Sequence, residues 1–422
     1  MLVGTGRRAI NPEVGHKLAG YGPDYPNEGI HDDVCVTALY MKDGSGIEAL
    51  LLNFDLAGIL RPLVRAVREK ICAETGVDMS RIFCTCTHTH TGPEVRTMSY
   101  VGGPKDMARE DYNQKLPGIA AEAAVEAGNS AEECTLHYNY TQADYNMSRR
   151  YSFPDRRNLY IPQYKQLAGT SPDYVDCEIG IIAFRKANTS NQYKAIISNY
   201  TMHPVCVGNS TNLVSADYQG YVRRTVEETF AGCMCLATTG AAGDNHPLKP
   251  EAGFEYAREV GTGLGQTIIS RVYDAVEVEY DTELRCAYAP VSLKARDKAS
   301  AQQLPDPEKR GPLWLMTEGI EEIETDYYIL GIGPIMLAGV PGELVSELGA
   351  QLKWSNPFLK AYVLYQATDN IQYIAARNQY RWGGYEADTA CHAAGQGEFL
   401  VNTMLESARE LLKENPLEIP PA

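Results

Sequence analysis

Two histidines stand two residues apart in the stretch 83–94, which reads Phe-Cys-Thr-Cys-Thr-His-Thr-His-Thr-Gly-Pro-Glu. The alternation of threonine with cysteine and histidine predicts a strand, on which residues two apart point to the same face. Gly92-Pro93 ends this strand, because proline has no N–H for the ladder. We therefore expect His88 and His90 at a strand end, as a metal site or an acid/base site. A pair of hydrogen-bonded core histidines is the structural alternative.

The spacing limits how many of these side chains could bind one ion. Same-face neighbours on a strand are about 6.6–6.8 Å apart along the chain, whereas zinc–ligand distances are about 2.0–2.3 Å. At most an adjacent pair could share a metal, so the remaining ligands must come from elsewhere. Cys84 and Cys86 lie on the same predicted face, but they are more typical of buried structural thiols.

Three further residues with nitrogen or oxygen donors follow other predicted strands. They are His203 after a strand at 192–200, Glu343 after two strands at 326–341, and Tyr373 after a strand at 361–367. A catalytic zinc site combines such ligands with an open position for water, and the ion lowers the pKa of that water to about 7. These strand ends suggest one metal centre, provided that the fold brings them together.

The composition excludes several kinds of partner. Asp and Glu number 54 against 38 Lys and Arg, which gives a formal net charge of −16, and no basic run is long enough to suggest a nucleic-acid partner. The sequence contains no apolar run of 18 residues, so no transmembrane segment is predicted. The first residues lack the apolar core of a signal peptide. The eleven cysteines show no disulfide-type spacing, so we expect a cytoplasmic protein with reduced thiols.

The expected elements alternate as in α/β proteins. Strands at 34–41 and 47–55 precede a helix at 58–75, and the histidine strand follows. Later helices are expected at 114–127, 217–230, 250–275 and 396–413, and later strands at 134–141, 177–186, 192–200, 233–239 and 282–290. We predict one catalytic domain over 1–422, built from mixed β-sheets flanked by helices, with loop insertions at 142–175 and 296–325.

The residue types also bear on the ligand. Tyrosine outnumbers phenylalanine by 27 to 8, and a tyrosine combines an apolar ring with a hydroxyl tip. That suits a polar, sugar-like or amphiphilic ligand better than a bare acyl chain, although tyrosines facing solvent at strand edges would explain the excess equally well. Arg149 and Arg150 lie in the 142–175 insertion, where they could hold a carbonyl or carboxylate or balance local acids.

The chain resembles the catalytic domain of the neutral/alkaline non-lysosomal ceramidase family over nearly its whole length. The most specific motif is Thr-His-Thr-His-Thr-Gly-Pro at 87–93, followed in order by Pro-Gly-Glu at 341–343 and a tyrosine-rich segment. The other matching motifs are Ala9–Pro12, Gly29–Asp32, His203-Pro204, Gly240–Asp244, Asn370–Tyr373 and Tyr385-Glu386. The resemblance implies a ceramidase-like catalytic α/β fold, which we expect here without the family's C-terminal immunoglobulin-like domain.

The resemblance also implies a zinc site and a set of catalytic residues. The implied zinc ligands are His88, His203, Glu343 and Tyr373. The implied catalytic residues are His90, as the acid/base beside the metal-bound water, and Arg149 and Tyr385, as hydrogen-bond donors to the carbonyl under attack. Arg150 is an alternative to Arg149. The implied reaction is amide hydrolysis, in which metal-activated water attacks the carbonyl and these donors stabilise the oxyanion.

One motif departs from the family pattern. Ceramidases carry a serine in Gly-Asp-Val-Ser-Pro, whereas residues 243–247 read Gly-Asp-Asn-His-Pro, so that His246 takes the place of the serine. We therefore expect a zinc hydrolase with a small-molecule substrate. This is either an N-acyl lipid, cleaved at an amide or ester-type carbonyl, or a polar sugar- or cyclitol-like compound, cleaved at an ester, lactone or glycosidic bond. A non-catalytic, metal-stabilised binding protein is the third alternative.

Overall fold

The structure is a computed structural model that describes residues 1–21, 25–96, 107–152, 158–160, 174–296 and 320–418. Its largest unit is a nine-stranded sheet, in the order β13-β11-β10-β6-β1-β3-β4-β5 with β15 paired to β6. The strands are β1 (Leu2–Ala9), β3 (Cys35–Lys42), β4 (Glu48–Phe54), β5 (Ile82–Cys86), β6 (Glu132–Gln142), β10 (Glu178–Lys186), β11 (Tyr193–Tyr200), β13 (Met234–Thr239) and β15 (Val276–Glu277). The β4–β5 and β11–β13 pairs are parallel, and the others are antiparallel.

Four helices cover one face of this sheet. They are α1 (Arg61–Thr75), α2 (Met107–Asn129), α3 (Asp217–Thr229) and α4 (Phe254–Val272). In α1 the residues Val64, Val67 and Ile71 form one buried stripe, and Gly76 ends the helix in a left-handed conformation with φ 76°. On β4 the residues Leu50 and Leu52 pack with this stripe. Alternate residues of the strand therefore face the helices, because successive side chains of a strand point to opposite faces of the sheet.

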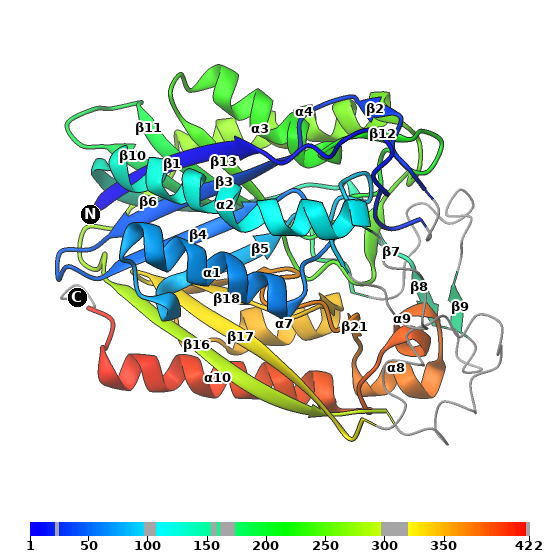
Figure 1. The fold of residues 1–422 in the computed structure, drawn as a ribbon. Coiled ribbons are helices and arrows are strands. Elements are labelled where there is room, and N and C mark those ends of the chain that lie inside the picture. Colours follow the sequence, from blue (N-terminus) through cyan, green and yellow to red (C-terminus); the bar gives the residue numbers. More distant parts are fainter. Residues whose placement is uncertain (22–24, 97–106, 153–157, 161–173, 297–319, 419–422) are drawn as a thin grey trace.

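A second sheet lies against the opposite face. Its order is β16-β17-β18-β20, and its strands are β16 (Leu284–Lys294), β17 (Glu322–Ile332), β18 (Ile335–Gly339) and β20 (Lys360–Leu364). Leu51 of β4 and Phe83 of β5 pack with Tyr328, Leu337 and other residues of the second sheet. Apolar side chains of α7 (Ser346–Ser355) and α10 (Gln396–Glu414) cover its outer side, so helices and sheets form four layers (Figure 1). Mixed sheets flanked by helices are thus confirmed.

The predicted insertions fall largely outside the described residues, which omit 153–157, 161–173 and 297–319. The first contains the short strands β7 (Asn146–Ser148), β8 (Arg150–Ser152) and β9 (Asn158–Tyr160). The second is wrong at its end, because Glu322–Thr325 already pair with β16 as part of β17. The single domain over 1–422 stays a prediction. No helix within the described ranges is long and apolar enough to cross a bilayer.

The carboxyl ends of several strands meet at one place. The Thr239 hydroxyl, at the end of β13, donates to the carbonyl oxygen of Thr87 over 2.7 Å. The Tyr365 N–H, just after β20, donates to the carbonyl of Thr239 over 3.2 Å, and the Cys86 N–H donates to the carbonyl of Tyr365 over 3.3 Å. These hydrogen bonds join the ends of β5, β13 and β20, where the candidate ligands begin.

A buried ion pair stabilises this end of the large sheet. Asp55, directly after β4, accepts two hydrogen bonds of 2.7 Å from the Arg223 guanidinium on α3 and one of 2.8 Å from the Cys35 N–H.

Asp55→Asn is expected to lower the free energy of unfolding by about 3–5 kcal/mol, because it leaves a buried arginine without its counter-charge. Denaturant unfolding would measure the loss. The matched control is Glu69→Gln in the exposed Arg65–Glu69 pair, which should leave stability nearly unchanged.

Candidate metal centre

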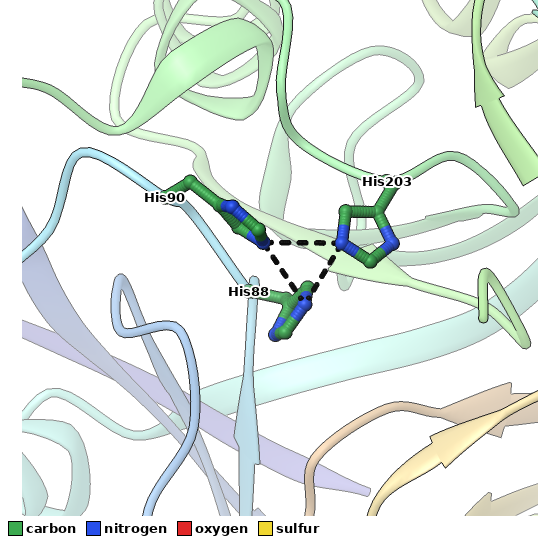
Figure 2. A group of neighbouring side chains, drawn as sticks. All are labelled: His88, His90 and His203. Atoms are coloured by element: carbon green, nitrogen blue, oxygen red, sulfur yellow. Dashed lines mark hydrogen bonds between the residues drawn. The ribbon is translucent and has the colours of Figure 1, made fainter. Parts of the chain in front are cut away.

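Three histidine side chains converge where these strand ends meet (Figure 2). His88 and His90 follow β5, and His203 follows β11. The Nε2 atoms of His88 and His203 are 3.0 Å apart, those of His88 and His90 are 3.2 Å apart, and those of His90 and His203 are 3.1 Å apart. His88 and His203 are buried, and His90 is partly buried. Three nitrogens of one type therefore surround a single point.

The path of the chain after β5 differs from the predicted strand. The strand ends at Cys86, not before Gly92-Pro93, and His88 has a left-handed backbone with φ 70°. Few non-glycine residues adopt this conformation, so alternation could not predict it. The hydroxyls of Thr89 and Thr91 each donate to the carbonyl of Ser215 over 2.9 Å. The turn is thereby held against the residues before α3, and both imidazoles reach the same point.

The second ring nitrogens show which atoms can bind a metal. His88 Nδ1 is hydrogen-bonded to the carbonyl of Ala57, and His203 Nδ1 is 3.1 Å from the carbonyl of Ala242. Each Nδ1 must carry the proton, because a carbonyl oxygen only accepts. Both Nε2 atoms then present a lone pair toward the centre. Metal-bound histidines in proteins commonly have this kind of support.

The distances test whether zinc fits this group. Two imidazole nitrogens bound to tetrahedral zinc at about 2.0–2.1 Å would lie about 3.3–3.4 Å from each other. The observed separation of 3.0 Å between the Nε2 atoms of His88 and His203 is close to that value. Burial, followed by the influence of His88, lowers the pKa of both His90 and His203 well below the ordinary value. These rings are then neutral at neutral pH, as metal binding requires, and the residues fit the ion.

Glu343 and Tyr373 meet beside the histidines. They are directly paired in the short parallel ladder of β19 (Glu343–Leu344) and β21 (Tyr373–Ile374). Glu343 Oε2 lies 3.4 Å from His88 Nε2 and accepts a hydrogen bond of 3.3 Å from the Tyr365 hydroxyl. Burial alone would raise the pKa of Glu343, but the adjacent His88 and a hydrogen bond with Tyr373 bring it below the ordinary value. An ionised carboxylate therefore faces the three nitrogens.

His90 differs from the other two histidines in its support. Its Nδ1 is buried and has no hydrogen-bond partner among the described residues. Its ring instead packs edge-on against Tyr21, with 5.2 Å between ring centroids, and against the backbone of Gly20. The Nε2 atom can share the metal centre, yet no carbonyl fixes the tautomer of the ring. That freedom suits a group that exchanges protons.

Gly20→Ala tests the packing around His90. A Cβ atom at Gly20 would lie 2.3 Å from His90 Nδ1, so the new methyl group must displace the ring. We expect turnover to fall at least about tenfold, because small misplacements of reacting groups can cost up to about 100-fold, while bound zinc per chain is unchanged. The matched control is Gly15→Ala, since Gly15 has a similar φ of 90° but nothing within 4 Å of the added atom. Equal losses in both variants would contradict the prediction.

Arg149 lies on another side of the cluster. Its guanidinium carbon is 5.3 Å from the ring centroid of Tyr373 and 5.1 Å from that of Tyr385. Tyr385 is 42% exposed, so this tyrosine stands at the solvent edge of the group. The neighbouring Arg150 donates to the carbonyl of Gly383 over 2.9 Å. The structure thus brings Arg149 and Tyr385 to the predicted ligands and directs Arg150 toward Gly383.

His246, at the position where the motif departs from the family, is buried inside the site. Its ring stacks on that of His203, with centroids 4.7 Å apart and planes at 24°. Its Nε2 accepts a hydrogen bond of 2.6 Å from Arg149. Burial, followed by the nearby Arg149, lowers the pKa of His246 well below the ordinary value. A neutral imidazole therefore connects a candidate ligand with a candidate catalytic arginine.

Two residues of the site had no role in the sequence-based prediction. Tyr365 donates to Glu343, and Glu386 accepts hydrogen bonds from both Arg149 and Arg150. Tyr365 lies near the end of the strand predicted at 361–367, where a residue of the site could have been suspected. Glu386 was visible only as part of the Tyr385-Glu386 motif, because nothing in the sequence near it indicates which charges it binds.

Comparison with solved structures identifies proteins of similar fold. Among solved structures, the neutral ceramidase from Pseudomonas aeruginosa is similar with a TM-score of 0.75 and 18% identity, covering 100% of this chain and 76% of that one. A structure described as ceramidase complexed with C2 has a TM-score of 0.75 and 17% identity, with the same coverage. These likenesses confirm the predicted ceramidase-like α/β fold.

Sequence comparison gives the family itself. A search of curated proteins finds no match. Residues 1–243 match the family described as neutral/alkaline non-lysosomal ceramidase, N-terminal, and this match spans more than half of the 422 residues. The matched part includes His88, His90, His203 and Arg149. The chain belongs to the neutral/alkaline non-lysosomal ceramidase family, a family of hydrolases.

Proposed function

We propose that this protein is a zinc-dependent hydrolase that cleaves an amide or ester-type carbonyl in an N-acyl compound. The observation that carries the proposal is the convergence of three Nε2 atoms, within 3.0–3.2 Å of one another, beside the carboxylate of Glu343. Lone pairs that face one another repel, and a cation between them turns this repulsion into attraction. Membership of a hydrolase family supports the same activity.

Four residues would hold the zinc ion: His88, His203, Glu343 and Tyr373. The first two have the Nδ1 support that metal-bound histidines commonly show, and Glu343 adds negative charge beside them. Zinc bound there would act as a Lewis acid and would lower the pKa of a bound water molecule to about 7. Burial raises the pKa of Tyr373 well above the ordinary value, so its hydroxyl stays protonated in the protein alone.

His90 would move protons during the reaction. Its Nε2 faces the centre, its pKa is lowered by burial, and no hydrogen bond from a described residue fixes its Nδ1. The neutral ring can take a proton from the attacking water at Nε2 and pass it to the leaving nitrogen or oxygen. General acid–base catalysis of this kind contributes about 100- to 10,000-fold to a rate.

Arg149 and Tyr385 would bind the carbonyl oxygen. A guanidinium and a phenol are both donors, and the guanidinium carbon of Arg149 lies 5.1 Å from the ring centroid of Tyr385. Preset donors stabilise the negative charge that develops on the oxygen as the tetrahedral intermediate forms. The exposed edge of Tyr385 offers a route by which the substrate could approach.

A second candidate is hydrolysis of a polar sugar- or cyclitol-like substrate at an ester, lactone or glycosidic bond. The observation that favours it is the polarity of three residues at the histidine cluster: Arg149, His246 and Glu386. All three side chains are buried and polar, and such groups suit hydroxyl-bearing ligands better than an acyl chain. The two candidates share the metal site and differ only in the substrate.

A two-class substrate panel tests the proposal. The first class contains N-acyl amides, including a short-chain ceramide, and the second contains sugar esters, lactones and aryl glycosides. Each assay is run on the purified protein, after chelation, and after zinc is restored. We expect amide cleavage that the chelator abolishes and zinc restores. Chelator-sensitive cleavage confined to the second class would support the second candidate, and turnover that survives complete zinc removal would contradict both.

A further inference from the structure

Arg149 is held from three sides within the protein. Its Nε donates to Glu386 Oε1 over 2.5 Å, one terminal nitrogen donates to His246 Nε2 over 2.6 Å, and the other donates to the carbonyl of Gly243 over 2.8 Å. Each of the three guanidinium nitrogens therefore has a different protein acceptor. Because a guanidinium is planar and rigid, three acceptors in different directions determine both its plane and its rotation.

The carboxylate in this arrangement is itself immobilised. Glu386 is fully buried, and its second oxygen accepts a hydrogen bond of 2.6 Å from Arg150. Arg150 is in turn bonded to the carbonyl of Gly383. Two adjacent arginines thus share one carboxylate, and the positive charge of only one of them is balanced by it. Arg150 is therefore linked to Arg149 through the shared carboxylate.

The imidazole in this arrangement has a defined tautomer. Arginine can only donate, so the Nε2 of His246 must accept and its proton must reside on Nδ1. The backbone holds this geometry, since β14 (Asn245–Pro247) pairs with β7 and the Arg149 N–H donates to the carbonyl of Asp244 over 2.9 Å. The stacking of His246 on His203 then sets the distance between the guanidinium and the histidine cluster.

We propose that Glu386 and His246 are positioning residues that together orient the guanidinium of Arg149 toward the metal centre. The inference deepens the proposed function and rests on it, because it assumes that Arg149 binds the carbonyl oxygen. Neither residue touches the reacting atoms. Their effect reaches the substrate through Arg149, and preorganised donors of this kind lose much of their value when they are misplaced by about 1 Å.

A double-mutant cycle tests this dependence. Glu386→Gln keeps the shape of the side chain but removes its charge, and His246→Phe keeps the ring on His203 but removes the acceptor. Each is expected to lower kcat by about 10- to 100-fold with bound zinc unchanged. In the Arg149→Ala background the same changes should lower kcat less than about twofold, because residues that act through a shared partner are not additive. Full additivity would overturn the proposal.

A matched control separates positioning from general destabilisation. Asp281 also holds a buried arginine, Arg285, through two hydrogen bonds of 3.0 Å, and that arginine contacts Asn415 near the end of the described chain. Asp281→Asn should lower the melting temperature and leave kcat unchanged in both backgrounds. If it lowered kcat as much as Glu386→Gln does, loss of stability would explain both effects and the proposal would be wrong.

Crystal structures of the variants give a readout that needs no substrate. In zinc-loaded Glu386→Gln and His246→Phe, the guanidinium of Arg149 is expected to leave its place beside Tyr373, whereas in Asp281→Asn it should remain. If Arg149 keeps its wild-type position in both site variants, the inference is overturned, whatever the kcat of those variants. Absence of zinc-dependent turnover in the wild-type protein would instead contradict the proposed function, so the two failures can be distinguished.

Discussion

Replacing His203 by alanine is expected to remove bound zinc and turnover together. His203 supplies one of the converging Nε2 atoms, and its Nδ1 is fixed by the carbonyl of Ala242. Changes to groups that merely support a ligand typically cost about 10- to 100-fold in metal affinity or activity, so loss of the ligand itself should cost more than about 100-fold. Zinc per chain, measured by elemental analysis after dialysis, and kcat on the panel substrate would be recorded for the same sample.

His137→Ala is the matched control for this experiment. His137 is also buried, at 3% exposure, but it lies on β6, where its ring nitrogen is bonded to Thr135. This variant should keep one zinc per chain, even if its stability falls. A His203→Ala protein that retained zinc as tightly as the wild type would contradict the ligand set, whatever its activity.

Replacing His90 by alanine is expected to abolish most turnover while zinc stays bound. The prediction follows from the difference in support, because the Nδ1 atoms of His88 and His203 are bonded to carbonyls and that of His90 has no described partner. Loss of a general acid/base should lower kcat by about 100- to 10,000-fold. The four groups His88, His203, Glu343 and Tyr373 remain to hold the ion.

The cluster geometry makes this result informative in either direction. His90 Nε2 lies 3.2 Å from His88 Nε2 and 3.1 Å from His203 Nε2, nearly as close as the 3.0 Å between those two atoms. If zinc were lost from His90→Ala as completely as from His203→Ala, the imidazole would be a ligand, and the acid/base would have to be another group. Circular dichroism of both variants would show that the comparison is made between folded proteins.

Much of the fold was predictable because its helices and strands follow simple periods. The stripe of Val64, Val67 and Ile71 predicts α1, and the Gly76 stop lies where the helix ends. The strand β1 was missed, because Gly4 and Gly6 are poor strand formers in isolation. In the structure a Cβ atom at Gly4 would lie 1.9 Å from the carbonyl of Ala127 on α2. Glycine in a strand often marks the close approach of another backbone, but the local pattern does not show which helix approaches.

The composition of the candidate site was predictable in part, and its geometry was not. Histidines and a glutamate after successive strands indicated which residues to consider, and the family resemblance selected among them. The left-handed backbone of His88, which turns both imidazoles inward, has no signal in the sequence. The hydrogen bonds from Arg149 and Arg150 to Glu386 also have no signal in the sequence, since these partners lie 237 and 236 residues away along the chain. Contacts of this range depend on the packing of the sheets.

The central claim is that these residues form a zinc centre, and anomalous diffraction at the zinc absorption edge tests it most directly. Crystals grown with one equivalent of zinc should give a single strong anomalous peak in contact with His88, His203 and Glu343, with Tyr373 completing the site. Such a peak would establish the ion and its ligands without any assumption about the substrate. An anomalous map of these crystals without a peak between these side chains would contradict the account.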